Sequence, residues 1–391
     1  MNILFLYSEA INPQVGGVER VTFTLANYFE AKGYKVFFLG LTDSYSIKDK
    51  RQFFLPDSSS FISERNIVFF RSFLAEKSID IVINQGGTIP EISKLASYCK
   101  IEGVKLISVV HNSLLATIAN FSSVNKNKFE KNGISWLLPY TDTKIVKYLL
   151  LKLYKRKYAE HYKSLCKKSD YVFLLSEKYK QELVFFMDGQ SIDNVVGIPN
   201  PVSFDEIVKI RKKKEILYVG RINTSQKRVD LLLQIWGLLD NRFADWSLKI
   251  VGDGDELESM KVLSSKLNLQ NVSFYGFRDP KPFYETASIF GMTSSFEGLP
   301  MTLIEAMQYG VIPVAFDSFL SATDIIDDEV NGCLIRPFDV NEYVNALSKL
   351  MSSQEELEWY STAAEQKVKR FDLSIVGEQW LNVFKELNIC C

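Results

Sequence analysis

Short apolar runs alternate with helix-length segments along most of this chain, and that alternation is the strongest constraint on its fold. Ten runs have the length and composition of buried strands. They are 3–7, 35–40, 79–84, 105–110 and 171–175 in the first half, and 216–219, 247–251, 272–275, 289–293 and 311–315 in the second. Segments with helical periodicity lie between them, such as 18–32, 229–239 and 257–267. The pattern predicts an α/β protein with parallel sheets and helices on both faces.

The length of the chain and one proline-containing junction predict two domains of this kind. With 391 residues, the chain is long for a single hydrophobic core. The stretch GIPNPVSFDEIVKIRKKKE, residues 197–215, separates the two series of strands, and we place the junction near 199–213. We expect Rossmann-like domains at 1–198 and 199–370, facing each other across a cleft. Such sheets bind ligands outside the carboxyl ends of their strands.

Composition and charge exclude several classes of protein. An apolar fraction of 47% and a charged fraction of 24% describe an ordinary globular chain. A formal net charge of −1 argues against nucleic-acid binding driven by overall charge. No window reaches the roughly 18 uninterrupted apolar residues of a membrane span. The start, MNILFLYSEA, indicates a strand rather than a secretory signal. The five cysteines show no metal-ligand spacing, and their odd number, together with the expected lack of a signal peptide, fits a reducing cytoplasm better than a disulfide framework.

Two cations follow the first strand of the second domain, in ILYVGRINTSQKRVDLLLQIW, residues 216–236. Arg221 and Lys227 would stand at the mouth of the ligand crevice. There arginine can offer a bidentate fork to a phosphate group, and lysine can offer a point charge. The alternative is a solvated basic loop.

The stretch SSFEGLPMTLIEAM, residues 294–307, places Glu297 and Glu305 on either side of a helix start. Acids near a helix N-terminus favour its dipole, which explains Glu297 better than Glu305, since the latter stands among apolar residues. Gly298 lets the backbone approach a ligand closely, and Pro300 suits the first helical position. The backbone amides that follow would form an anion site. Both loops of this domain therefore predict phosphate binding.

The first domain supplies three weaker candidates. Gly16 and Gly17 lie between the first strand and its helix, without the dinucleotide fingerprint G-x-G-x-x-G. His111 directly follows an apolar strand and would lie at the crevice, although a lone histidine is as often structural. His161 lies in a lysine-rich helix, and we assign it to the surface.

One metal-like pair is better explained by turn chemistry. Asp253 and Asp255, in VGDGDELE, end a strand and begin a helix, where glycine and aspartate serve turn and cap roles. We therefore expect no metal site.

In this order, the motifs resemble the retaining glycosyltransferases of the group 1 family (family 4), which have the GT-B architecture. The most specific mark is Glu297 and Glu305 with seven residues between them, in a Glu-Gly-Leu-Pro context. Supporting marks, in order, are Gly16-Gly17-Val-Glu-Arg, His111, Ile198-Pro-Asn-Pro, Gly220-Arg221 with Lys227, Val251-Gly-Asp-Gly and Phe274-Tyr-Gly276. Arg228 departs from the family pattern, because many relatives have glycine there, and this puts the local loop shape in question.

The resemblance implies a role for each site residue. Arg221 and Lys227 would hold the diphosphate of a nucleotide-sugar donor, and Glu305 would accept hydrogen bonds from the ribose hydroxyls. Glu297 would contact hydroxyls of the donor sugar, and His111 would approach the reacting carbon. Loops would make the remaining contacts: to sugar and phosphate from Gly298, Leu299, Pro300 and Met301, to the base from Gly276, Phe277 and Arg278, and to the diphosphate from Gly16 and Gly17.

The resemblance also implies a reaction without a metal ion or cofactor. Protein cations and amides would neutralise the leaving phosphate, with His111, Glu297, Arg221 and Lys227 as the catalytic set. Glu297 would not act as a nucleophile, since no second carboxylate forms a glycosidase-like pair with it. The C-terminal segment, 371–391, would form a helix that returns to the first domain, with Ile375 among its inward residues.

The expected activity is hexosyl transfer from a nucleotide-sugar, with a UDP-sugar favoured, to a glycan or lipid-linked acceptor in bacterial cell-surface polysaccharide biosynthesis. One alternative is a nucleotide-sugar epimerase of the same fold, which would need further acid-base carboxylates that we do not identify. Another is a catalytically silent sugar-nucleotide-binding protein, which the intact set of site residues disfavours.

A basic segment, residues 144–168, suggests a membrane surface as a further partner. It holds nine Lys or Arg against one Glu. Its apolar residues recur at near-helical spacing, and they are Ile145, Val146, Leu149, Leu150, Leu153 and Tyr154. The preceding ISWLLPY, residues 134–140, adds further apolar and aromatic side chains. We expect a cytoplasmic protein, peripheral at the inner leaflet; the alternative is a core-packed helix with a solvated basic face.

Overall fold

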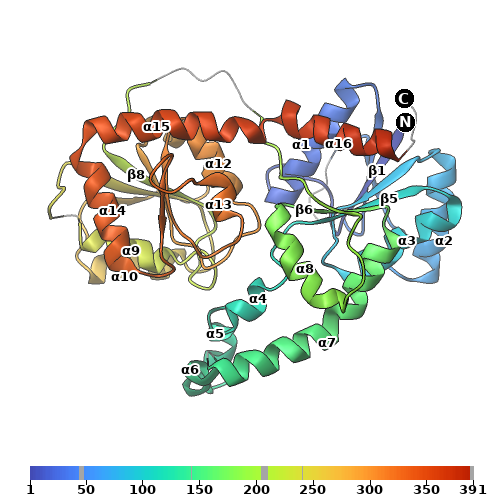
Figure 1. The fold of residues 1–391 in the computed structure, drawn as a ribbon, viewed down its shortest axis with the longest axis horizontal. Helices are drawn as coiled ribbons and strands as arrows, with labels where there is room; N and C mark the ends of the chain where they lie inside the picture. The colour runs from blue at the N-terminus through green and yellow to red at the C-terminus, as the bar shows by residue number, and fades with distance from the viewer. Residues whose placement is uncertain (44–47, 142, 204–209, 240, 388–391) are drawn as a thin grey trace. The chain divides into compact units, whose positions relative to one another are not determined.

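The protein forms two compact units in a computed structural model that describes residues 1–43, 48–141, 143–203, 210–239 and 241–387 (Figure 1). The first unit comprises residues 1–114, 151–203 and 371–391, and the second comprises 115–150 and 204–370. The expected junction, 199–213, includes residues 204–209, which lie outside the described residues. Residues 115–150 cluster with the second unit although the expected first domain included them. Its described residues form short helices and the beginning of one long helix, and none of them belongs to a strand of the first sheet.

The first unit is built on a seven-stranded parallel sheet in the order β3-β2-β1-β4-β5-β6-β7. Its strands are β1 (Asn2–Leu6), β2 (Lys35–Gly40), β3 (Gln52–Phe54), β4 (Ile81–Asn84), β5 (Lys105–Val110), β6 (Tyr171–Leu174) and β7 (Val195–Gly197). All five strands expected in this half are confirmed. The other two, β3 and β7, are three residues long and lie at the sheet edges. A run that short shows no periodicity in the sequence.

Helices cover both faces of this sheet (Figure 1). They are α1 (Gly17–Ala31), α2 (Glu64–Glu76), α3 (Pro90–Ser97), α7 (Lys144–Lys168), α8 (Lys180–Met187) and α16 (Leu373–Glu386). Before α7 come α4 (Ala116–Ala119), α5 (Phe121–Lys131) and α6 (Leu138–Thr141). Within the described part of the chain, no helix is both long and apolar enough to cross a lipid bilayer.

The second unit repeats the architecture with a six-stranded parallel sheet in the order β10-β9-β8-β11-β12-β13. Its strands are β8 (Glu215–Val219), β9 (Ser247–Val251), β10 (Val272–Phe274), β11 (Ile289–Met292), β12 (Ile312–Phe316) and β13 (Cys333–Ile335). Its helices are α9 (Val229–Gly237), α10 (Leu257–Lys266), α11 (Lys281–Thr286), α12 (Met301–Gln308), α13 (Ala322–Ile325), α14 (Val340–Ser352) and α15 (Gln354–Val368). The five expected strands are confirmed here too.

Each sheet has one point where the strand order changes direction, and these points position the site residues. In the first unit β1 lies between β2 and β4, and in the second β8 lies between β9 and β11. Ligands of doubly wound sheets bind outside the carboxyl ends of the strands at such a switch point. In the second unit, the predicted cations follow β8, and the Glu-Gly-Leu-Pro turn follows β11. The two predicted phosphate-binding loops therefore belong to adjacent strands.

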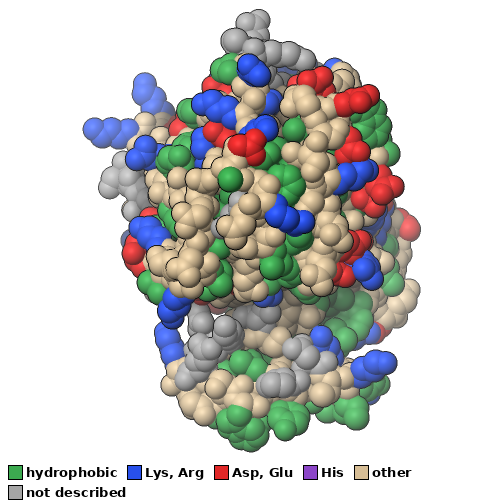
Figure 2. Space-filling model, turned by 90° about the vertical axis from the view of Figure 1, so that its left-hand side faces the viewer, with side chains coloured by type: hydrophobic (Ala, Val, Ile, Leu, Met, Phe, Trp, Pro, Cys, Tyr) green, Lys and Arg blue, Asp and Glu red, His purple; other side chains and the backbone are tan. Residues whose placement is uncertain are grey.

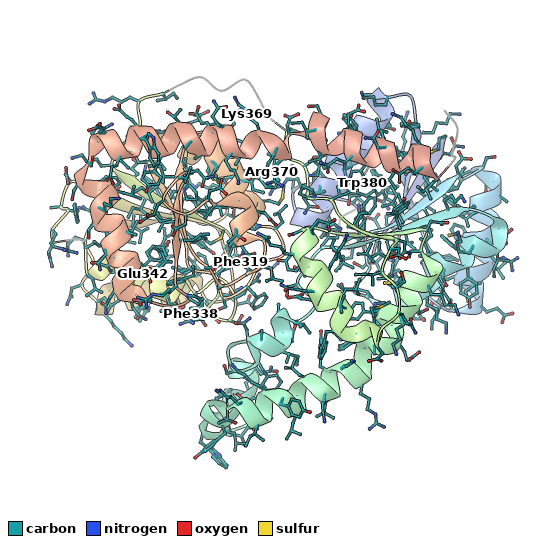
Figure 3. The ribbon with its side chains drawn as sticks, in the orientation of Figure 1. Phe319, Phe338, Glu342, Lys369, Arg370 and Trp380 are labelled. Atoms are coloured by element: carbon teal, nitrogen blue, oxygen red, sulfur yellow. The ribbon has the colours of Figure 1, made fainter. Side chains whose placement is uncertain are left out.

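The C-terminal helix α16 packs in the first unit, which confirms that the chain returns to it. Its Trp380 ring lies 6.0 Å from the ring of Phe29 on α1 and 4.6 Å from that of Phe173 on β6 (Figure 3). The Phe384 ring lies 5.2 Å from the same Phe29 ring, tilted by 55°. The expectation that Ile375 points inward is wrong, because this side chain is 47% exposed. Asp372 caps the helix, which begins at Leu373. The first buried residue of the helix is Val376, the residue after Ile375.

This packing makes Trp380 a strong contributor to stability. We expect Trp380→Ala to lower the free energy of unfolding by about 3–5 kcal/mol, because it removes a buried indole from an aromatic cluster. Ile375→Ala, on the exposed face of the same helix, should change it by less than about 0.5 kcal/mol. Urea unfolding followed by circular dichroism measures both. Equal losses in the two variants would contradict the observed packing of α16.

Candidate functional site

The loop that follows β8 carries both predicted cations, Arg221 and Lys227. The Arg221 side chain is exposed, and within the described residues its guanidinium group forms no ion pair. The phenol of Tyr218 donates to the Arg221 carbonyl oxygen at 2.7 Å. The Asn223 side chain accepts from the backbone N–H groups of Gln226 and Lys227 at 3.0 and 2.8 Å. These bonds fix the loop backbone, so the exposed arginine stands on a defined frame.

The glycine-containing loop after β9 packs directly on the β8 loop. A Cβ atom on Gly252 would lie 1.9 Å from the Gly220 carbonyl oxygen, and one on Gly254 would lie 2.3 Å from the Ile222 carbonyl oxygen. Gly252 also has a φ of +140°, which disfavours any side chain. The Ile222 N–H donates to the Asp253 carbonyl oxygen at 2.8 Å. The Val-Gly-Asp-Gly motif is therefore needed to bring two strand-end loops together.

The acidic residues of this motif serve the turn. The Asp253 side chain accepts from the Gly254 N–H at 2.7 Å, while Glu256 accepts from the Thr224 N–H of the β8 loop at 2.7 Å. Among the described residues, no three His, Cys, Asp or Glu side chains gather in a way that could hold a metal ion.

Lys227 and Glu297 form an ion pair that the sequence did not indicate. The Lys227 Nζ lies 2.6 Å from Oε1 of Glu297, and the two side chains are only 17% and 8% exposed. Gln226 Nε2 donates to the Phe296 carbonyl oxygen at 3.2 Å beside them. A buried charge without a partner is strongly destabilising, so each member of the pair offsets the cost of burying the other. Arg221 is then the exposed cation of this loop.

Hydrogen bonds from a side chain and from the backbone also join the loop after β11 to the loop after β8. Thr293 Oγ1 donates to the carbonyl oxygens of Lys227 and Arg228 at 3.2 and 2.9 Å. The Ser295 N–H donates to the Gln226 carbonyl oxygen at 2.6 Å. The two loops at the switch point are thus one connected structure.

The Glu-Gly-Leu-Pro turn leads into α12 as expected, with one difference. Pro300 is the residue before the helix rather than its first residue, and α12 begins at Met301. The Gly298 carbonyl oxygen accepts from the buried Ser321 hydroxyl at 2.7 Å, which fixes the turn. Leu299 and Met301 are buried. The first N–H groups of a helix have no intrahelical acceptor, so this helix start can bind an anion.

Glu305 and the β10 loop complete the predicted set. Glu305 is half-buried, and the phenol of Tyr284 donates to its Oε2 at 3.1 Å. Gly276, with a φ of +68°, accepts from the Gly252 N–H at 2.8 Å and so extends the connected loops to β10. Phe277 beside it is 76% exposed, and Arg278 donates to a backbone carbonyl oxygen of its own loop.

The loop shape at Arg228, which the sequence left in question, is now defined. Arg228 adopts the left-handed conformation, with φ of 51° and ψ of 43°. A glycine enters this region freely, whereas another residue pays about 1–2 kcal/mol. The guanidinium group is held by the Asp230 carboxylate, with nitrogen to oxygen distances of 3.1 Å. The arginine therefore keeps the backbone shape that glycine would take.

In the first unit, the structure explains one of the two glycines locally. A Cβ on Gly16 would lie 2.3 Å from Oε2 of Glu19, whereas one on Gly17 would meet nothing within 4 Å. Gly16 therefore makes room for the Glu19 carboxylate at the start of α1, and burial raises the pKa of that carboxyl group. A role of either glycine toward a diphosphate stays a prediction.

His111 forms a close pair with a residue that the sequence reading missed. Its Nε2 lies 2.6 Å from Oε1 of Gln85, which directly follows β4 and is buried. Burial lowers the pKa of His111 from 6.5 to about 4, so the ring is neutral at pH 7. The loop around it is fixed by the buried Glu182, which accepts from the Ser113 hydroxyl at 2.8 Å and the Leu114 N–H at 2.6 Å. Gln85 could have been found, since it is the first polar residue past a predicted strand end.

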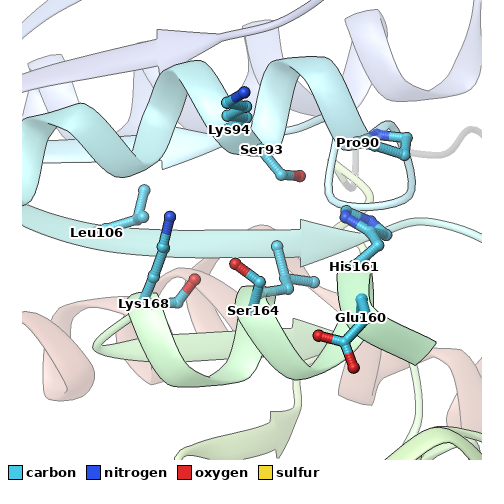
Figure 4. A pocket seen from close by; sticks show the side chains of 10 residues that line it. Pro90, Ser93, Lys94, Leu106, Glu160, His161, Ser164 and Lys168 are labelled. Carbon is cyan, nitrogen blue, oxygen red and sulfur yellow. The ribbon is translucent and has the colours of Figure 1, made fainter. Parts of the chain in front are cut away.

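The assignment of His161 to the surface is wrong. Its ring is half-buried, and Nε2 lies 2.9 Å from the Gly87 carbonyl oxygen. It lines a cavity of about 280 Å³ between α3 and α7, together with Ser93, Ser164 and Lys168 (Figure 4). His161 is surrounded by lysines in the sequence, which favour an exposed position. Its side of the helix nevertheless faces the protein and not solvent.

The depressed pKa of His111 makes stability depend on pH in a defined direction. Folding favours the neutral ring, so stability is lost as the pH falls from about 6.5, where the unfolded ring gains a proton, toward 4. Between pH 7.5 and pH 5 this contribution should be about 2 kcal/mol. Urea unfolding of the wild type and His111→Gln at both pH values isolates it, because other titrating groups are common to both. Identical losses in the two proteins would contradict the burial of this ring.

Two family models match consecutive parts of the chain. The model described as Glycosyltransferase Family 4 matches residues 15–206, and the model described as Glycosyl transferases group 1 matches residues 201–367. Together they span both units and every predicted site residue.

Relatives and solved structures agree with these matches. An uncharacterized glycosyltransferase of Haemophilus influenzae is 27% identical over 94% of this chain and 96% of its own length. The lipopolysaccharide 1,6-galactosyltransferase of Escherichia coli K12 is 32% identical over 49% of this chain and 55% of its own, so that alignment spans about half of each protein.

Two solved structures share the whole fold. The lipopolysaccharide outer core galactosyltransferase WaaB in its apo form has a TM-score of 0.71 and 22% identity, covering 99% of this chain and 100% of its own. The Anabaena protein HepE, in complex with UDP and glucose, has a TM-score of 0.72 and 15% identity, with the same coverage. At these identities the likeness shows the fold, which is GT-B.

Proposed function

The chain belongs to the group 1 glycosyltransferases of family 4, and from that premise we propose that it transfers a hexose from a nucleotide-sugar with retention of configuration. One observation carries the proposal. At the switch point of the second sheet, an exposed Arg221, the Lys227–Glu297 pair and the start of α12 belong to loops joined by backbone hydrogen bonds. A diphosphate next to a sugar is the ligand whose charges and hydroxyls match this set.

The diphosphate is bound by both cations in this proposal. Arg221 offers a guanidinium fork that no described carboxylate occupies. Lys227 carries three N–H donors, so it can bind a phosphate oxygen while it remains close to Glu297. As the bond to the sugar breaks, negative charge grows on the leaving phosphate, and fixed cations and helix-start amides stabilise that charge.

Glu297 orients the donor sugar rather than attacking it. Its carboxylate is held by Lys227 and therefore accepts hydrogen bonds from sugar hydroxyls in a fixed position. The leaving phosphate oxygen takes the proton of the acceptor hydroxyl, which attacks on the same face. His111 is neutral at pH 7 and contacts the sugar near the reacting carbon, while Gly16 and Gly17 approach the diphosphate.

The base is uracil in this proposal. Support comes from relatives by fold: HepE is solved with UDP and glucose, and the pneumococcal O-GlcNAc transferase GtfA with UDP and GlcNAc. Glu305 is half-buried on α12 and accepts hydrogen bonds from the ribose hydroxyls. Gly276, Phe277 and Arg278 receive the base at the end of β10.

The acceptor is a glycan or lipid-linked glycan of a bacterial cell-surface polysaccharide. Relatives whose names support this include the Escherichia coli enzyme above and a Campylobacter jejuni transferase that is named for its diphospho-undecaprenol glycan acceptor. A lipid-linked acceptor implies work in the cytoplasm at the inner face of the membrane. An epimerase of the same fold has less support, because the site carboxylate Glu297 is committed to Lys227. A silent binding protein would show no turnover at all.

Arg221 should dominate the affinity for the nucleotide. We expect Arg221→Ala to weaken UDP binding by about 10- to 100-fold, since a charge-assisted contact is worth about 1.5–3 kcal/mol. Arg242→Ala is the matched control, because Arg242 is an exposed arginine of the same unit that lies in the turn region between α9 and β9. Isothermal titration calorimetry with UDP measures both variants. Unchanged affinity in Arg221→Ala would overturn the assignment.

Replacing Glu297 should separate binding from turnover. In Glu297→Gln, UDP affinity should be retained or increased, because Lys227 loses a competing negative charge. Turnover should fall about 100-fold or more, because the sugar loses its fixed acceptor. The donor is the UDP-sugar that raises the thermal stability of the enzyme most. A parallel collapse of UDP affinity would instead place Glu297 in the nucleotide site.

The proposal includes catalysis without a metal ion. Turnover of the same donor should persist in excess EDTA, because protein cations neutralise the diphosphate. Loss of activity with EDTA, reversed by a divalent cation, would contradict this part of the mechanism.

A further inference from the structure

Large apolar side chains are exposed in unusual density between residues 134 and 153. Seven of them are exposed within these twenty residues: Ile134, Trp136, Tyr140, Ile145, Tyr148, Leu149 and Leu153. The exposed fraction reaches 66% at Trp136 and 75% at Ile145. Single exposed apolar residues are ordinary, but a contiguous group of this kind marks a binding surface. None of these residues belongs to the proposed donor site.

The geometry of α7 places several of these side chains on one stripe. Ile145, Leu149 and Leu153 are four residues apart, so they lie above one another on the helix surface. The opposite side of the helix carries Leu150 and Tyr154, which are half-buried. Near-helical spacing relates all of these apolar residues in the sequence. In the structure, some lie on a covered side of the helix and the others on an exposed side.

The far half of the same helix is firmly attached to the first unit. Tyr162, Leu165 and Cys166 are buried, and Asp188 after α8 pairs with Lys155 and Lys163 at 2.6 and 2.8 Å. The N-terminal half of α7 therefore extends from a fixed base, with its stripe exposed.

Positive charge accompanies the stripe. Lys152 and Arg156 are exposed and, by their spacing, lie on the same side of the helix as Ile145 and Leu149. Lys144, at the first position of the helix, is also exposed. The sequence has no acidic residue from 144 to 159. Figure 2 shows hydrophobic side chains at the lower end of the molecule, where α6 and the beginning of α7 lie, with basic side chains beside them.

The combination of exposed apolar, aromatic and basic side chains indicates which kind of partner this surface binds. A protein partner would be matched by mixed charge and a shaped groove, whereas a single exposed helix with large apolar, aromatic and cationic residues matches a lipid–water interface. There, apolar side chains enter the acyl boundary, Trp and Tyr lie at headgroup level, and Lys and Arg pair with anionic headgroups. We propose that the exposed face of 134–156 binds the surface of an anionic lipid bilayer.

Vesicle sedimentation of the full chain tests this proposal. Vesicles of phosphatidylglycerol and phosphatidylcholine should bind the wild type at about 0.1 M salt, and pure phosphatidylcholine or 0.5 M salt should bind it much less. The triple variant Ile145→Ser, Leu149→Ser, Leu153→Ser should bind at least about tenfold more weakly. The matched control is Val184→Ser, Leu238→Ser, Val262→Ser, whose three side chains are 53–54% exposed elsewhere.

The possible results distinguish a lipid surface from a second copy of the protein as the partner of this face. Equal vesicle binding by the stripe variant and the control would overturn the proposal. If the wild type is a dimer that the stripe variant converts to a monomer, while neither binds vesicles, the face is an interface between copies. Unchanged thermal melting and UDP affinity in the stripe variant exclude misfolding. Because vesicle binding needs no donor, its failure and that of the proposed function are distinguishable.

A separate observation concerns the Gln85–His111 pair in the first unit. His111 Nδ1 and Gln85 Nε2 are both buried, and neither has a hydrogen-bond partner within the described residues. Buried polar atoms without partners are rare and need an explanation, such as a ligand. The Gln85 backbone N–H donates to the Leu6 carbonyl oxygen at 2.9 Å, so β1 holds the pair in place.

The geometry points to Gln85 as a positioning residue that keeps the His111 proton on Nε2. The atom that faces His111 Nε2 is the Gln85 side-chain oxygen, at 2.6 Å. An amide oxygen only accepts hydrogen bonds, so the ring nitrogen is the donor. Nδ1 is then left as an acceptor for a hydroxyl group, while Gln85 Nε2 remains a donor. This assignment rests on the proposed function, in which that hydroxyl belongs to the donor sugar.

Nitrogen NMR tests this assignment without an activity assay. The chain has two histidines, so His161→Gln leaves only the His111 signals. We expect one neutral tautomer, protonated at Nε2, and a mixture of tautomers in Gln85→Met. In Gln85→Glu, the new carboxylate should raise the pKa of His111, so the histidine signals should change at a higher pH than in the parent protein. A ring protonated at Nδ1, or a tautomer unchanged in Gln85→Met, would overturn the role of Gln85 even if transferase activity is confirmed.

Discussion

The second unit depends on the close approach of two backbone segments, the loops after β8 and β9. Gly252 lies so near the Gly220 carbonyl oxygen that any Cβ atom would overlap it. Through this contact the β9 loop supports the loop that carries Arg221 and Lys227. Hydrogen bonds from Thr293 and Ser295 then bind the β11 loop to the same frame. Because backbone groups and the uncharged side chains of Asn223 and Thr293 make most of these contacts, Arg221 is held in place without a structural ion pair of its own.

Lys227 is the exception, and its pairing with Glu297 links the two halves of the proposed site. A half-buried lysine without a counter-charge would be costly, and so would the more deeply buried glutamate. Each residue thus pre-organises the other in the absence of ligand. In the proposed mechanism, a bound diphosphate gives the lysine a second anionic partner, and the glutamate then interacts mainly with sugar hydroxyls. Arg221 needs no such partner, because it is exposed.

The sequence predicted what depends on local pattern and missed what depends on distance along the chain. Ten strands were visible as apolar runs, but β3, β7 and β13 are too short to show a period. The ion pair joins residues seventy positions apart, and nothing local indicates it. Helical spacing shows that apolar residues share a helix but not which side of it meets the protein. The apolar residues of α7 therefore divide between a covered and an exposed side, and Ile375 lies on the exposed side of α16. His161 was misplaced for the same reason.

The most direct test of the central claim is hydrogen exchange, measured by mass spectrometry, with and without UDP. The account predicts slower exchange of backbone amides in residues 220–228 and 297–303, where the β8 loop and the start of α12 would enclose the diphosphate. Uridine, which lacks the phosphates, should leave these peptides nearly unchanged. Protection that appears elsewhere, or that uridine reproduces fully, would contradict a diphosphate site at the switch point of the second sheet.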